Sequence, residues 1–147
     1  MLFRSLNNSI AKALIAMCCT CAFANTAELA IRVNGIKSNE GTIGCALFAT
    51  AKGFPMDLKA ATVQRHDASR EGVTCRFAGL TPGRFAVAVS HDVNGNLKTD
   101  TKMFGLPTED WGVSNNVRHR MRPPNFEEAA FDLEEGKTAS IEVMVGR

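Results

Sequence analysis

The sequence predicts an all-β protein, a seven-stranded antiparallel β-sandwich with one long ordered loop. Short runs of alternating apolar and polar residues, separated by turn residues, predict the strands. No long amphipathic helix and no helix–strand alternation interrupts them. The expected strands cover residues 29–33, 43–47, 63–65, 73–77, 85–91, 129–133 and 141–145. At 147 residues the chain has room for one domain with a substantial core.

The first 24 residues have the pattern of a signal peptide. Arg4 and Lys12 precede an apolar run that ends in Ala22-Phe23-Ala24, a small-x-small sequence suited to signal peptidase. The run, 13–24, is about 12 residues long, whereas a spanning helix needs roughly 20, so a permanent anchor is the weaker interpretation. We therefore expect cleavage after Ala24, a single mature domain of residues 25–147 without a transmembrane segment, and a periplasmic or secreted location.

The cysteines predict one disulfide bond. Three of the five lie in the expected signal peptide, which leaves Cys45 and Cys75 in the mature domain. Both lie on apolar faces of expected strands, in a compartment that permits disulfides. We therefore favour a bridge between them over two separate buried thiols.

The charge balance argues against a nucleic-acid partner. Removal of Arg4 and Lys12 lowers the 17 Lys and Arg to 15, which equals the 15 Asp and Glu. The mature domain is therefore close to neutral and lacks the basic field that nucleic-acid binding needs.

The first strands are predicted by alternation on either side of turns. Apolar residues occupy every second position in 29–33 and again in 43–47. Residues 38–41, Ser-Asn-Glu-Gly, supply turn chemistry between them, so we expect these two strands to form a hairpin. A proline-containing break follows, and 56–61 has room for a single helical turn before the extended course resumes at 63–65.

The strongest strand leads into the long loop. After the alternating run 73–77, the turn 80–83 has sequence Leu-Thr-Pro-Gly, in which proline presets one central φ angle and glycine tolerates the positive φ that follows. Residues 85–91 then alternate again and place His91 at the strand exit. The last two expected strands flank a turn at 134–137.

The long loop, residues 92–125, carries side-chain oxygens at spacings that can wrap a hard cation such as calcium. Connections in compact domains typically span about 4–6 residues, so a loop of this length suggests a function. The candidate metal ligands are Asp92, Asn94, Asn96, Asp100 and Glu109. The glycine and glutamate positions of an EF-hand do not match. The same Asp and Asn residues also fit successive Asx-turns with no metal.

A hydrolase is the alternative from another class. His91 with Asp92 or Glu109 has the residue types of an acid/base or metal-dependent centre, and Ser114 has the hydroxyl of a nucleophile. However, Ser114 lacks the second glycine of a nucleophile elbow and follows no strand-to-helix turn. His91 shares a face with Val89 and also fits a hydrogen-bonded histidine at the rim of the core that fixes the loop. We therefore expect a protein that is not an enzyme.

Trp111 and a short basic run suggest a third possibility, a binder of cell-surface polysaccharide. The run RHRMR, residues 118–122, places three arginines where they could meet anionic groups. In the simpler interpretation Trp111 folds back to cap the sandwich, and the arginines form a solvated face offset by Glu127 and Glu128. The expected partners are a cell-envelope protein or a polysaccharide.

Several segments resemble a known bacterial family. HDVNGNLKTD, GLPTEDWGVSNN and PPNFEEAAFDL resemble the defining segments of exported proteins known as domain of unknown function 2141. GLTPGRFAVAV is similar to the strand before them and to the turn of transthyretin-like and carboxypeptidase-regulatory-like sandwiches. The resemblance implies a small exported immunoglobulin- or transthyretin-like sandwich without an assigned activity. Its implied signature positions are His91, Asp92, Asn94, Asn96, Asp100, Gly105, Pro107, Glu109, Gly112, Ser114 and Asn115, with Trp111 at a position where other aromatics are common.

The sequence thus predicts an exported, non-enzymatic β-sandwich interaction module, with calcium as the candidate cofactor of its Asp- and Asn-rich loop.

Overall fold

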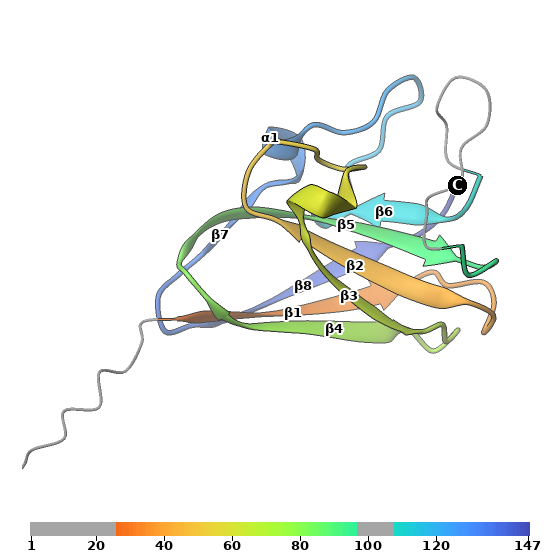
Figure 1. The fold of residues 1–147 in the computed structure, drawn as a ribbon, viewed down its shortest axis with the longest axis horizontal. Helices are drawn as coiled ribbons and strands as arrows, with labels where there is room; N and C mark the ends of the chain where they lie inside the picture. Colours follow the sequence, from red (N-terminus) through yellow and green to blue (C-terminus); the bar gives the residue numbers. More distant parts are fainter. Residues whose placement is uncertain (1–25, 97–107) are drawn as a thin grey trace, which may run out of the picture.

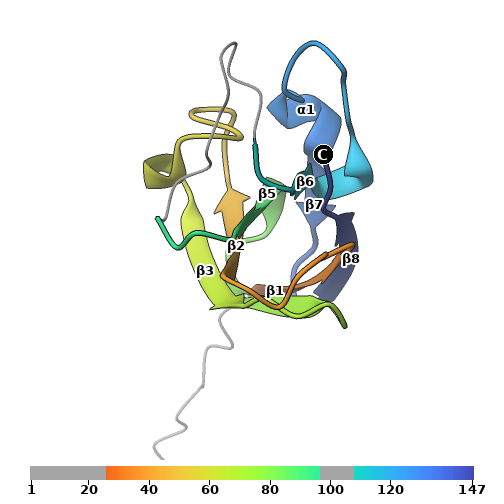
Figure 2. The same ribbon diagram turned by 90° about the vertical axis from the view of Figure 1, so that its right-hand side faces the viewer.

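Two β-sheets pack face to face in the computed structural model, which describes residues 26–96 and 108–147 (Figures 1 and 2). The first sheet has the strand order β4-β1-β8, and the second has the order β3-β2-β5-β6, with β7 paired to β5. The strands are β1 (Ala27–Asn34), β2 (Thr42–Phe48), β3 (Thr62–Asp67), β4 (Val73–Leu80), β5 (Gly83–Asp92), β6 (Trp111–Val113), β7 (Phe131–Leu133) and β8 (Thr138–Met144). The short helices are η1 (Leu58–Ala60), η2 (Ser114–Asn116) and α1 (Phe126–Ala129). The predicted all-β class is confirmed.

The strand count differs from the prediction because β6 was missed. This strand has three residues, and its register on β5 pairs Trp111 with Ser90 and Val113 with Ala88. Three residues are too few for an apolar alternation to be recognised, so the sequence shows no strand pattern there. Residues 26–96 and 108–147 therefore contain eight strands in place of the seven predicted.

The predicted β1–β2 hairpin is wrong. β1 pairs antiparallel with β4 and parallel with β8, whereas β2 pairs with β3 and β5 in the other sheet. Both arrangements bury the same alternating face, so the alternation itself cannot distinguish a hairpin from a crossing between sheets. The parallel β1–β8 pair also means that the sandwich is not wholly antiparallel.

The core between the sheets contains the predicted disulfide bond. Cys45 of β2 and Cys75 of β4 are fully buried and joined by an S–S bond of 2.02 Å. The bond connects the two sheets within a cluster of apolar side chains that all the longer strands except β3 supply. The apolar alternation that predicted the strands also placed both sulfurs on inward faces.

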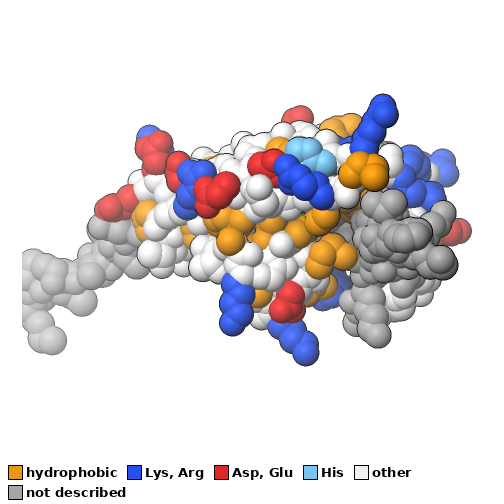
Figure 3. Space-filling model, turned by 90° about the horizontal axis from the view of Figure 1, so that it is seen from above, with side chains coloured by type: hydrophobic (Ala, Val, Ile, Leu, Met, Phe, Trp, Pro, Cys, Tyr) orange, Lys and Arg blue, Asp and Glu red, His pale blue; other side chains and the backbone are white. Residues whose placement is uncertain are grey.

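A second apolar cluster lies on the outer face of the β3-β2-β5-β6 sheet. The rings of Phe48, Phe54 and Phe126 stack edge to face, with centroids 5.2 and 5.9 Å apart. Phe54 comes from the 49–61 connection and Phe126 from α1, so these two segments together cover this outer face (Figure 1). Viewed from above, apolar side chains run along this face between charged ones (Figure 3).

The two lateral sides of the sandwich are closed in different ways. On the β3–β4 side, the Gln64 side chain donates to the Arg76 carbonyl (2.5 Å) and accepts from the Arg76 amide (3.1 Å). On the β6–β8 side, Trp111 and Gly146 exchange two backbone hydrogen bonds of 3.1 Å. There the Asn116 side chain also donates to a β8 carbonyl and accepts the Met144 amide (2.7 Å). Each amide side chain thus acts like the backbone of a neighbouring strand.

Within residues 26–96 and 108–147, no helix is long and apolar enough to cross a membrane. The expected signal peptide, residues 1–24, lies outside the described residues.

Candidate functional site

Five polar or charged side chains are buried in the part of the chain that the structure describes, and all of them flank the interval 97–107. Burial of a polar group is costly unless the group is hydrogen-bonded, so the partners of these side chains indicate their role. We call them the anchor set: His91, Asp92, Glu109, Asp110 and Ser114.

His91 joins the exit of β5 to the 38–41 turn. Its ring is 2% exposed, and Nε2 lies 2.8 Å from the Glu40 carbonyl oxygen. A carbonyl oxygen only accepts, so Nε2 carries the proton. The turn packs so closely on the strand that a Cβ at Gly41 would lie 2.0 Å from the Asp92 carbonyl oxygen. This geometry is that of a histidine which fixes the loop.

Asp92 and Asn94 stabilise the first turn of the long loop. Asp92 Oδ1 accepts hydrogen bonds from the amides of Gly95 (2.7 Å) and Asn96 (3.2 Å), and Asn94 Oδ1 accepts from Asn96 (3.1 Å). These are Asx-type contacts, in which a short polar side chain satisfies nearby backbone donors. Three of the expected calcium ligands therefore lie together in one turn that their own side chains organise.

Glu109 and Asp110 tie the returning chain to two other elements. Glu109 Oε1 accepts the Val93 amide at 3.1 Å, which links the two ends of the 97–107 interval. Asp110 Oδ1 lies 3.0 Å from Lys37 Nζ and 3.3 Å from Arg147 Nε. Sequence reasoning missed this ion pair because its cations are 73 and 37 positions away from Asp110.

Ser114 is a buried connection between β5 and the last residue of α1. Its Oγ accepts the Val87 amide at 2.9 Å and donates to the Ala129 carbonyl at 2.5 Å. Next to it, Asn115 has a positive φ of 61° and donates from Nδ2 to the carbonyls of Glu128 and Ala130. Ser114 and Asn115 thus hold residues 128–130 against the sheet.

Trp111 is partly buried beneath an arginine. The Arg118 guanidinium lies 4.6 Å from the ring centroid and donates to the carbonyls of Trp111 (2.8 Å) and Gly146 (3.0 Å). Gly112 beside it is required by close packing, since a Cβ there would lie 2.4 Å from the Met144 carbonyl oxygen. Trp111 therefore joins β6 to the end of β8, and Arg118 is occupied by internal contacts.

Glu128 organises the rest of the basic run. Both of its carboxylate oxygens accept from Arg122, at 2.9 and 2.7 Å, and His119 Nε2 lies 3.0 Å from Oε1. Glu128 also forms a capping box with Asn125 at the start of α1. The Arg122 hydrogen bond and, after it, the Asn125 backbone lower the pKa of Glu128 to about 2. Two of the three arginines thus stabilise the fold locally.

The expected metal ligands are only partly assembled in the residues that the structure describes. Asp92, Asn94 and Asn96 share one turn, and Glu109 contacts the same turn through Val93. No group of three or more His, Cys, Asp or Glu side chains able to hold a metal ion occurs in residues 26–96 and 108–147. Asp100, Gly105 and Pro107 lie outside the described residues.

Fold and site together define a class: a disulfide-linked all-β sandwich in which buried polar side chains hold both ends of a long interval. Residues 31–142 match a bacterial family described as an uncharacterized protein conserved in bacteria, domain of unknown function 2141, and the chain belongs to that family. The family resemblance predicted from the sequence is therefore confirmed. Comparison with curated proteins and with solved structures gave no match.

Proposed function

We propose that the protein is an exported, non-enzymatic binding module that contacts a cell-envelope partner through the end of the sandwich at which the anchor set lies. One observation carries the proposal. Every member of the anchor set makes a hydrogen bond or an ion pair, and together these contacts fix the chain before and after the 97–107 interval. Long loops held by a rigid scaffold commonly carry binding functions.

The contacts of the candidate catalytic groups support a non-enzymatic role. Ser114 Oγ is 1% exposed and donates its proton to a backbone carbonyl, which is not the arrangement of a nucleophile beside a general base. His91 uses Nε2 on the Glu40 carbonyl, so this nitrogen is not available to accept a substrate proton. The hydrolase alternative therefore requires these groups to leave stabilising contacts.

Export is supported by the disulfide bond. Bonds of this kind persist in oxidising compartments and are rare in the bacterial cytosol. Together with residues 1–24, Cys45–Cys75 favours a periplasmic or secreted protein. Expression of the full chain should yield an extracytoplasmic product whose intact mass corresponds to a start at Asn25. A full-length product retained in the cytosol would contradict export.

The binding surface can be tested with two matched lysine substitutions. Val93 is 44% exposed at the exit of β5, whereas Glu135 lies in the turn after β7, near the opposite end of β5. We expect Val93→Lys to weaken retention of isolated cell envelope on the immobilised protein and Glu135→Lys to leave it unchanged. Equal retention of cell envelope by both variants would show that the binding surface does not include the end of the sandwich at Val93.

Enzymatic activity has its own test. The wild-type protein and a folded His91→Gln variant are assayed against a panel of esters, glycosides and peptides. The non-enzymatic proposal is overturned if the wild-type protein hydrolyses one of these substrates and the variant does not.

Calcium is a second candidate, as a ligand of the turn that starts at Asp92. The favouring observation is that the Asp92 and Glu109 carboxylates and the Asn94 amide all contact this one short turn. If calcium binds the folded state, the melting temperature in millimolar calcium should exceed that in EDTA. Asp92→Asn keeps an acceptor oxygen for Gly95 while removing charge, so it should abolish the shift. Identical melting of the wild-type protein in both conditions would exclude calcium.

A further inference from the structure

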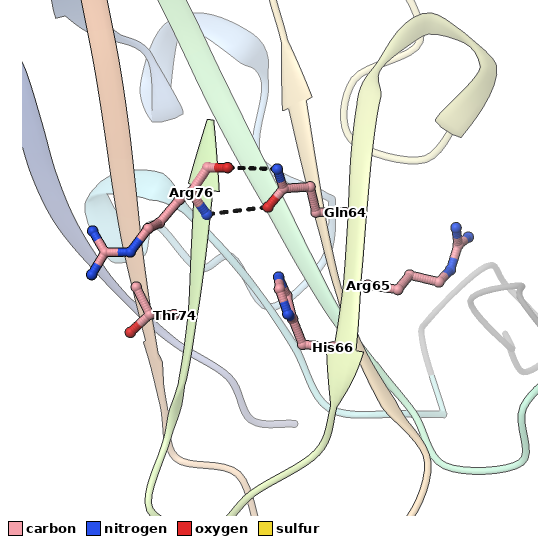
Figure 4. A pocket seen from close by; sticks show the side chains of 5 residues that line it. All are labelled: Gln64, Arg65, His66, Thr74 and Arg76. Carbon is pink, nitrogen blue, oxygen red and sulfur yellow. Dashed lines mark hydrogen bonds between the residues drawn. The ribbon is translucent and has the colours of Figure 1, made fainter. Parts of the chain in front are cut away.

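The β3–β4 side of the sandwich contains a cleft of about 390 Å³ that is separate from the anchor set. Here the edge strands of the two sheets face each other, and the Gln64 amide bridges them through both backbone groups of Arg76 (Figure 4). The lining residues are Gln64, Arg65, His66, Thr74 and Arg76. Inferences about this cleft do not depend on the proposed function at the other site.

The chemistry of the cleft is that of hydrogen-bond donors and cations. The His66 ring lies between the two strands (Figure 4). Thr74 Oγ1 accepts from Arg32 Nη1 at 3.4 Å, which leaves its hydroxyl proton for an outside acceptor. Both polar atoms of Gln64 are already used by the Arg76 backbone. None of the lining residues is acidic, so an anion would meet no repulsion from the lining itself.

The two arginines at this cleft have no acidic partner, as is true of six of the nine arginines in residues 26–96 and 108–147. Arg65 and Arg76 make no ion pair with any acidic side chain in residues 26–96 and 108–147. In contrast, Arg84, Arg122 and Arg147 each pair with a carboxylate. Arg65 and Arg76 therefore carry positive charge that no carboxylate in the described residues neutralises.

The directions of the two arginines decide what kind of anion fits. In Figure 4 their side chains extend away from each other, on opposite sides of the pair of edge strands. One small anion cannot contact both guanidinium groups, whereas a chain with repeated anionic groups can cross the cleft and meet each in turn. The lining residues include no Phe, Tyr or Trp and only one ring, that of His66, so the cleft lacks the row of aromatic side chains on which successive bases stack in single-stranded nucleic-acid binding.

We propose that the β3–β4 cleft binds an anionic polysaccharide, with Arg65 and Arg76 contacting successive sulfate or carboxylate groups and His66 and Thr74 lying beneath the chain. This assigns polysaccharide binding to arginines other than those of the 118–122 run, of which Arg118 and Arg122 make internal contacts.

The test uses the purified protein and a heparin oligosaccharide as the probe. We expect an affinity that falls with added salt, and a double Arg65→Gln/Arg76→Gln variant that binds about fivefold to tenfold more weakly. The variant should fold, because Gln64 contacts only the backbone of Arg76. A melting curve like that of the wild-type protein checks this.

The matched control is Arg120→Gln, which removes an exposed arginine from the 118–122 run. It should leave heparin binding unchanged. Amide signals of residues 64–66 and 74–76 should shift on titration, and neutral dextran should cause no shift. The proposal is overturned if Arg120→Gln weakens binding as much as the double variant does, if inorganic phosphate competes at the affinity of heparin, or if a single-stranded oligonucleotide binds the cleft more tightly than heparin.

Discussion

The edge strands of the two sheets are connected by different numbers of contacts on the two lateral sides of the sandwich. On the β6–β8 side, the Asn116 amide contacts β8, and a two-bond backbone bridge and Arg118 contact Gly146 just after it. On the β3–β4 side, Gln64 alone makes the described hydrogen bonds between the edge strands, and a cleft remains next to it. The tightly closed side is held by several contacts, whereas the other side leaves its edge accessible.

This difference gives the disulfide bond a specific role. Cys75 lies on β4, and Cys45 lies on β2, the neighbour of β3. The covalent link therefore holds the two sheets together next to the side that has few hydrogen bonds. We infer that the β3–β4 side depends on the disulfide more than the β6–β8 side does.

The largest expected effect follows from removing that link. The Cys45→Ala/Cys75→Ala double variant should lose about 2–5 kcal/mol of unfolding free energy, because the bond constrains the unfolded chain. Urea denaturation measures the loss. Hydrogen exchange should accelerate more at β3 and β4 than at β6 and β8. Uniform acceleration in all four strands would contradict the difference between the two sides.

The tightly closed side should be sensitive to a single methyl group. Gly112→Ala would place a Cβ 2.4 Å from the Met144 carbonyl oxygen and 3.0 Å from Val143 Cγ1, so β6 must move away from β8. We expect a loss of about 1–3 kcal/mol in unfolding free energy, typical of overpacking. Gly79→Ala is a poor control because of its positive φ, whereas Ala78→Ser changes an exposed position of β4 and should have little effect. A stable Gly112→Ala protein would show that β6 does not need this close approach.

The side-chain amides of Gln64 and Asn116 allow a direct comparison of the two lateral sides. Gln64→Ala and Asn116→Ala each remove two hydrogen bonds to an edge strand, with an expected cost of about 1 kcal/mol. The Arg76 amide should exchange faster in Gln64→Ala, because it loses its only described acceptor. The Trp111–Gly146 bridge should preserve slow exchange around β8 in Asn116→Ala. Gln64→Glu retains an acceptor oxygen and should protect the Arg76 amide. If amide hydrogen exchange accelerates equally in Gln64→Ala and Asn116→Ala, the two lateral sides do not differ in this respect.

The smallest effect concerns pH. The pKa of Glu128 falls from 4.5 to about 2 on folding, chiefly through the Arg122 hydrogen bond. Its stabilising contribution is therefore complete above the unfolded value and is lost as the pH decreases from about 4.5 toward 2. Because the carboxylate is partly exposed, solvent screening keeps the effect modest. Unfolding free energies at pH 6 and pH 3 should differ less in Glu128→Gln than in the wild-type protein, and equal differences would contradict this linkage.

Part of the fold and site was readable from local sequence patterns. Alternation located every strand except β6 and placed Cys45 and Cys75 on inward faces. The spacing of Asp92 and Asn94 indicated the polar turn after β5, although it fits both Asx-turns and a cation. These features depend on residues close together in the chain, which is why the sequence shows them.

The sequence by itself determined the all-β class, the strand that leads into the long loop and the cysteines available for pairing. Only the tertiary structure decided that β1 lies parallel to β8, that Asp110 pairs with Lys37 and Arg147, and that Gln64 meets Arg76 across two sheets. The physical reason is that an alternating pattern specifies which face of a strand is buried but not which strand lies beside it. Ion pairs and amide bridges between distant residues form only after packing has selected those neighbours.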